Sequence, residues 1–210
     1  SPLPAHCAAR RSSFPCAPHR PHKRLAVHVA ARASLPLAQP EQGQDLVDQG
    51  CSGIVTTCGF LTLLQDELRA ALDVPVATSS LMQFPMVQAL LPTNRHPGIL
   101  TISRPALTPA HLQAVGVPAD ASVMGTEGGR SFTRDILNDQ PSLNLEDCRL
   151  DMLDAAQALI NTDSQVGAII LECTNMAPYA AEIAEETGLP VFSVITLVHW
   201  LHAGLMPQRF

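Results

Sequence analysis

The chain has 210 residues, of which 46% are apolar and 4% aromatic, and its formal net charge is −6 at pH 7. This length and apolar content suffice for one large or two small packed domains, and no uninterrupted apolar run is long enough to span a membrane. The acidic chain also lacks the basic, aromatic-studded face that phosphate backbones require, so neither a nucleic acid nor a membrane is an expected partner.

The N-terminal segment 1–40 differs in composition from the rest of the chain. It holds six Lys or Arg residues, no acidic residue and seven of the 18 prolines. We therefore predict a mostly disordered or atypical segment over 1–40, in which only the run 25–31 could form a strand. An α/β domain is expected over 41–210, because from residue 42 short β-branched runs alternate with amphipathic segments of helical length.

This alternation predicts a parallel sheet with a helix after each strand, and an additional long helix over 145–161. The predicted strands cover 53–57, 74–78, 98–102, 122–125, 167–172 and 190–195.

An internal repeat links two parts of the chain. A shift of 115 residues aligns 54–92 with 169–207 without a gap, and seven positions are identical, among them Cys58 and Cys173. A shared βαβα architecture could produce several of these identities, but the coincidence of the cysteines favours two related units, about 53–92 and 168–207.

Cys58 and Cys173 each follow a predicted strand and precede a predicted helix. Open α/β sheets bind ligands at this position, and a helix N-terminus favours both a thiolate and a bound carboxylate. If approximate two-fold symmetry relates the units, one thiolate can remove a proton beside a carboxyl group and the opposite thiol can return one to the other face. Lys23 is the only lysine, so the folded body has no amine for a pyridoxal Schiff base, and a cofactor-independent reaction is expected.

Hydroxyl and amide groups near the cysteines could stabilise the negative charge of the intermediate. Each could equally be a structural cap, since Thr and Ser commonly begin helices. Glu172 precedes Cys173, and its charge would raise rather than lower the pKa of that thiol, or it could belong to a structural hydrogen-bond network. The candidates considered for substrate binding are Thr57, Gly59, Ser79, Ser80, Thr174 and Asn175.

The six cysteines show no CxxC pair and no disulfide framework. Reduced thiols in a cytoplasmic compartment are therefore expected, and no metal site is predicted.

Several segments resemble proteins of the aspartate/glutamate racemase superfamily: TTCGF (56–60), VATSSLMQ (76–83), GILTIS (98–103), GTEGG (125–129) and LECTNMAPYA (171–180). The resemblance implies two pseudo-symmetric Rossmann-like lobes with parallel sheets and the active site between them. It places Cys58 and Cys173 at the two catalytic positions, with Gly59, Thr174 and Asn175 at the substrate carboxylate and Ser79 and Ser80 at the cleft. It also implies a possible homodimer. Related proteins open with a strand and a glycine-containing loop, which segment 1–40 does not match.

The function expected from the sequence is racemisation or isomerisation at a carbon beside a carboxyl group of a small carboxylate, an amino acid or a derivative. Decarboxylation of an arylmalonate type and isomerisation of a maleate type are alternatives on the same scaffold. A degenerate, non-catalytic ligand-binding protein is a further alternative because of the unusual N-terminal segment.

Overall fold

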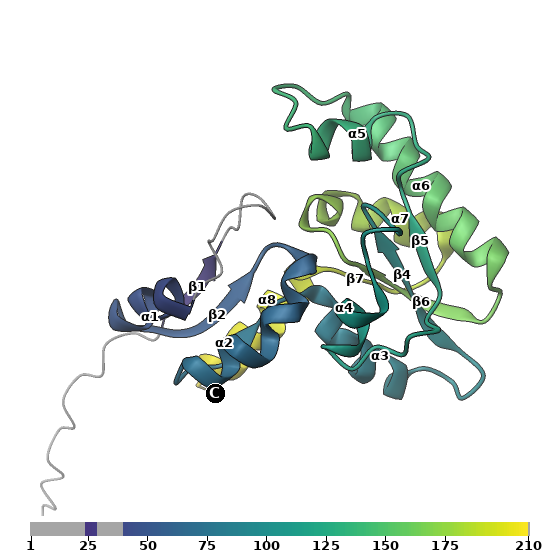
Figure 1. The fold of residues 1–210 in the computed structure, drawn as a ribbon. Coiled ribbons are helices and arrows are strands. Elements are labelled where there is room, and N and C mark those ends of the chain that lie inside the picture. Colours follow the sequence, from purple (N-terminus) through teal and green to yellow (C-terminus); the bar gives the residue numbers. More distant parts are fainter. Residues whose placement is uncertain (1–23, 29–39, 210) are drawn as a thin grey trace, which may run out of the picture.

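A computed structural model describes residues 24–28 and 40–209. Its strands pair in parallel and form a three-stranded sheet in the order β1-β2-β3 and a four-stranded sheet in the order β5-β4-β6-β7 (Figure 1). The strands are β1 (Arg24–His28), β2 (Cys51–Thr56), β3 (Val76–Ala77), β4 (His96–Thr101), β5 (Val123–Gly125), β6 (Val166–Leu171) and β7 (Val191–Phe192).

Helices follow the strands, as the alternating pattern predicts. The α-helices are α1 (Pro40–Asp48), α2 (Gln65–Ala71), α3 (Phe84–Leu90), α4 (Pro109–Gln113), α5 (Phe132–Leu137), α6 (Leu145–Thr162), α7 (Ala180–Thr187) and α8 (Val194–Leu205). Three short 3₁₀ helices also follow strands: η1 (Gly59–Leu64), η2 (Ser80–Gln83) and η3 (Thr174–Tyr179).

All six predicted strands and the long helix are confirmed, with bounds that differ by at most three residues. The prediction was wrong at the end of 190–195, where the strand stops at Phe192 and Val194 already begins α8. Ser193 causes this stop by capping the helix: its hydroxyl accepts a hydrogen bond from the N–H of Ile195 at 3.2 Å, and its own N–H donates to Thr196 Oγ1 at 2.9 Å.

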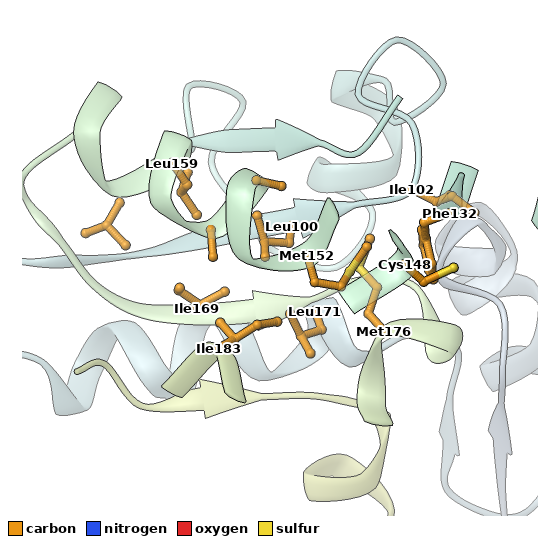
Figure 2. Packing of buried hydrophobic residues seen from close by; sticks show 13 residues of the cluster. Leu100, Ile102, Phe132, Cys148, Met152, Leu159, Ile169, Leu171, Met176 and Ile183 are labelled. Atoms are coloured by element: carbon orange, nitrogen blue, oxygen red, sulfur yellow. The ribbon is translucent and has the colours of Figure 1, made fainter. Parts of the chain in front are cut away.

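Strands β4 and β6, at the centre of the four-stranded sheet, are buried on both faces. Successive side chains of a strand point to opposite sides, so each face of the sheet packs against its own set of helices. On one face Leu100, Ile169 and Leu171 pack against α6 and α7, which contribute Met152 and Ile183; Figure 2 shows these residues in the cluster. On the other face Ile99, Ala168 and Ile170 pack against α3 and α4, which contribute Phe84, Val87 and Leu112. The apolar runs of β4 and β6 therefore belong to a covered parallel sheet.

The three-stranded sheet uses the same alternation. Ile54 of β2 packs with Leu68 and Leu72 toward α1 and α2. The next residue, Val55, packs on the opposite face with Val194 and Leu197 of α8.

The repeat units exchange their last helices. Helix α3 belongs to the first unit but covers the four-stranded sheet, whereas α8 belongs to the second unit but covers the three-stranded sheet (Figure 1). The two units are therefore packed into each other, and the carboxyl ends of β2 and β6 are brought together.

Strand β1 lies inside the N-terminal segment, where the sequence offered 25–31 as a possible strand, and it pairs with β2. The rest of the expectation for 1–40 falls on residues outside those described, and the domain boundary at residue 41 stays a prediction.

Candidate active site

The two cysteines occupy equivalent turns of the repeat. Cys58 lies between β2 and η1, Cys173 lies between β6 and η3, and both have extended backbones, with φ/ψ of −129°/113° and −81°/132°. The second half of each unit also corresponds, since α2 and β3 follow η1 as α7 and β7 follow η3. The register of 115 residues read from the sequence thus matches the order of elements.

A direct hydrogen bond joins the two turns. The hydroxyl of Thr174 donates to the carbonyl oxygen of Thr57, so the residue after one cysteine contacts the residue before the other. A second bond ties η2 to β6, because the hydroxyl of Ser80 donates to the carbonyl of Leu171, the last residue of β6, at 2.5 Å. Both bonds join segments more than 90 residues apart, and the first places the cysteine turns next to each other.

Both thiols are disfavoured as thiolates. Burial is the main cause for each: it raises the pKa of Cys58 above its ordinary value and that of Cys173 to about 12, and the charge of Glu172 raises both further. Neither sulfur forms an aligned capping hydrogen bond. The backbone N–H groups of the second and third residues after each cysteine nevertheless oppose the rise in pKa.

Glu172 is the buried acid of the site, with 2% of its surface exposed. Its Oε2 accepts a hydrogen bond from the hydroxyl of Thr101 at 2.8 Å. Burial raises the pKa of Glu172 to about 7, and the bonds from Thr101 and from the N–H of Ile102 oppose that rise. The sequence analysis expected the charge of Glu172 to raise the pKa of Cys173, and this is confirmed. It missed the burial of the carboxylate and its contact with the other turn; an acidic residue ending the apolar run GAIIL is the signal that marks it.

The residues predicted to bind substrate separate into two groups. Thr57, Gly59, Thr174 and Asn175 flank the sulfurs, and of these Asn175 is exposed. Gly59 packs directly against the carboxylate of Glu172, which leaves no room for a side chain there.

Ser79 and Ser80 are only 2% exposed and have structural partners. The hydroxyl of Ser79 accepts from the N–H of Leu81 at 3.1 Å and caps η2, while Ser80 bonds β6. The substrate-binding roles of both groups stay predictions.

A cavity of about 470 Å³ lies away from the cysteines, between the 125–130 loop and α6. Beside it, Asp151 of α6 accepts hydrogen bonds from the N–H groups of Arg130, Ser131 and Phe132, the residues after the Gly128–Gly129 turn, at 2.6, 2.8 and 2.9 Å. Within the turn, the N–H of Gly129 donates to the carbonyl oxygen of Thr126. A protein carboxylate therefore holds the backbone that follows this turn.

Within 24–28 and 40–209, no group of three His, Cys, Asp or Glu side chains could hold a metal ion. None of the helices described there has the length and apolarity needed to cross a membrane.

Comparison with known proteins relates the chain to a family of enzymes. The family model described as Asp/Glu/Hydantoin racemase matches residues 30–201. A dimethylsulfoniopropionate lyase from Durusdinium sp. clade D is 27% identical over 76% of this chain and 54% of its own length, and relatives from Emiliania huxleyi bear the same name at 25–30% identity. The chain spans about half the length of these curated relatives.

Solved structures share the fold at low identity. The allantoin racemase from Pseudomonas fluorescens has a TM-score of 0.58 and 18% identity, with 79% of this chain and 68% of that chain covered. An unliganded arylmalonate decarboxylase has a TM-score of 0.51 and 15% identity, with 79% and 73% covered. The predicted α/β fold with parallel sheets is thereby confirmed.

Proposed function

The chain belongs to the Asp/Glu/hydantoin racemase family, and from this premise we propose that it removes a proton from the carbon beside a carboxylate, with Cys58 and Cys173 as the reacting groups. The observation that carries the proposal is the pairing of the two turns, in which Thr174 of one turn bonds Thr57 of the other. No cofactor enters this reaction, because a thiolate and preorganised donors can supply its acid, base and charge stabilisation.

The two thiols have unequal roles in this proposal. The pKa of Cys173, about 12, favours its protonated form, so Cys173 serves as the protonated thiol, a donor of a hydrogen bond or a proton. Cys58 is the less strongly perturbed sulfur and serves as the base. A mechanism that needs one base suits this inequality better than one in which both sulfurs exchange roles.

We therefore propose elimination from a β-sulfonio carboxylate as the reaction, in line with the name that the curated relatives bear. The Cys58 thiolate takes the α-proton, a double bond forms between Cα and Cβ, and the bond from Cβ to the sulfonium sulfur breaks. Dimethylsulfoniopropionate would thus yield acrylate, dimethyl sulfide and a proton held on Cys58.

Racemisation of an amino acid or derivative is the second candidate. It shares the first step, but the carbanion is protonated on its other face by Cys173. The presence of both cysteines at equivalent positions of the repeat favours it. Decarboxylation and double-bond isomerisation use the same pair, but no contact in the structure selects them.

Proton NMR in D₂O distinguishes these reactions in one experiment. The wild type is incubated with dimethylsulfoniopropionate and separately with amino acids, allantoin and arylmalonates. We expect vinyl signals of acrylate and release of dimethyl sulfide from the first. Cys58→Ala should lower the rate by about a hundredfold or more, because a positioned base contributes at least that much, and Cys173→Ala should lower it less.

Cys51→Ala is the matched control, since Cys51 lies at the opposite end of β2 and should leave the rate unchanged. Exchange of the α-proton of an amino acid without elimination would replace the lyase proposal by racemisation. A folded chain that exchanges no α-proton in any of these compounds would contradict both and support the degenerate alternative.

A further inference from the structure

One carboxylate contacts both cysteine turns. Glu172 immediately precedes Cys173, and its side chain packs against Gly59, the residue after Cys58. Its Oε2 is bonded to Thr101, whereas its Oε1 is buried and forms no hydrogen bond with any described part of the chain. A buried carboxylate oxygen without a partner is costly if it is charged, and it is a ready position for a proton.

The charged groups that act on the thiols, among the described residues, are all acids. The titratable groups that act on Cys58 and Cys173 through their charge are Glu172 and, for Cys173, also Cys58. From the elements packed on the site, His111 of α4 contacts Phe60, and Glu127 bonds the backbone of Arg104 beyond β4, but none of these shifts the pKa of Glu172. No cation among the described residues offsets them, so two negative charges in this buried cluster repel each other strongly.

We propose that Glu172 is a positioning residue that shares one proton with the two thiols, keeping both sulfurs protonated when it is ionised and permitting one thiolate when it is protonated. In the exchange an S–H bond breaks and an O–H bond forms on the carboxylate, so the cluster keeps a single negative charge. The pKa of Glu172, about 7, supports a carboxyl group that holds a proton near neutral pH. The inference rests on the proposed function only in taking Cys58 and Cys173 as the reacting groups.

Such a cluster titrates as a unit rather than as independent sites. In the wild type, loss of the first proton gives mostly the carboxylate and a small, pH-independent fraction of thiolate. Loss of the second proton, at higher pH, gives the thiolate in full. Without the carboxylate, a thiol loses its proton in one step and at lower pH.

The test is the rate of alkylation of Cys58 and Cys173 by iodoacetamide across a pH series, with each cysteine followed by mass spectrometry. Wild type should show a low plateau near neutral pH and a second rise in alkaline solution. Glu172→Gln keeps the size of the side chain and removes its charge, so it should show one rise, with Cys58 alkylated roughly three- to tenfold faster near pH 8.

Glu172→Asp, which retains an acid, should restore the two-step profile, and a merely structural role would not predict this difference. Glu186→Gln on the exposed side of α7 is the matched control and should match the wild type. Cys51 serves as an internal reference in every sample. These measurements need no substrate, so a failure of this proposal can be distinguished from a failure of the proposed lyase or racemase activity.

A single rise in the wild type, or the same profile in Glu172→Gln, would overturn the proposal. If Glu172→Gln does not fold, the ¹³C shift of the Glu172 carboxyl is titrated in wild type and in the double variant Cys58→Ala/Cys173→Ala. Titration at the same pH in both, without a second step in the wild type, would also overturn the proposal; a two-step titration that becomes a single step in the double variant would support it.

Discussion

The turns that carry Cys58 and Cys173 have the same backbone course but differ in their neighbours. Thr57 precedes the first cysteine and Glu172 precedes the second; Gly59 follows the first and Thr174 follows the second. Each turn contacts the other through these differing positions, because Glu172 packs on Gly59 and Thr174 bonds Thr57.

The matching backbone course places the two sulfurs in similar turns, whereas the residues that differ between the turns set the packing and charge around each sulfur. Only the second turn carries a carboxylate, Glu172, and this makes the two thiols unequal. Gly59 leaves room for that carboxylate, and Thr174 supplies the hydroxyl that bonds Thr57, so both contacts between the turns can form. Under the proposed function, two thiols in matching turns can in this way take different acid/base roles.

The largest expected effect comes from removing the acid that distinguishes the turns. The pKa of Glu172 in the folded chain, about 7, lies above its ordinary value of 4.5, so its stabilising contribution is complete below pH 4.5 and is lost as pH rises through 7. Between those limits the free energy of unfolding of the wild type should fall by about 3 kcal/mol relative to Glu172→Gln.

Urea unfolding at a series of pH values measures this difference. Glu186→Gln, which removes an exposed carboxylate from α7, should remain parallel to the wild type. A constant difference between wild type and Glu172→Gln from acid to neutral pH would show that Glu172 titrates like an exposed glutamate.

A methyl group at Gly59 would break the fit between the turns. The Cβ of Gly59→Ala would overlap the carboxylate of Glu172. We expect a loss of about 2 kcal/mol in the free energy of unfolding, since overpacking a buried contact costs about that much. The loss should be smaller in a Glu172→Ala background, where the space is open.

Gly128→Ala is the matched control for this change, because nothing lies near the position of its Cβ. Additive losses in the double variant Gly59→Ala/Glu172→Ala, measured by urea unfolding, would argue that the two positions do not press on each other.

The smallest expected effect concerns the bond from Thr174 to Thr57. Thr174→Val keeps the shape of the side chain and removes its hydroxyl, so it should lower the free energy of unfolding by about 1 kcal/mol. Urea unfolding of this variant beside Thr162→Val, an exposed threonine at the end of α6, measures the bond. Equal stability of Thr174→Val and the wild type would mean that the turns are held together without it.

The order of strands and helices could be read from the sequence because local patterns determine it. Apolar runs predicted β4 and β6, and a long stretch of helical periodicity predicted α6. The predicted bounds of all three lie within two residues of the observed ones. The end of β7 was overestimated, because a single side-chain cap at Ser193 outweighed the β propensity of the residues after it.

Most residues of the candidate active site could be named from the sequence, but their contacts and burial could not. The cysteines could be named from the repeat, and Thr57, Gly59 and Thr174 from their positions beside the cysteines and from the family resemblance. The burial of Ser79 and Ser80 depends instead on the packing of η2 against β6. The role of Glu172 between the turns could not be read, because its contact with Gly59 joins residues 113 positions apart.

By itself, then, the sequence predicted two related units and determined the strand ends that carry Cys58 and Cys173 and the family to which the chain belongs. Only the tertiary structure decided which sheet each of the helices α3 and α8 covers, and which groups surround each sulfur. The physical reason is that strand and helix formation depends on neighbours a few residues away, whereas burial, charge and pKa depend on contacts that exist only after α3 and α8 have packed on the opposite sheets.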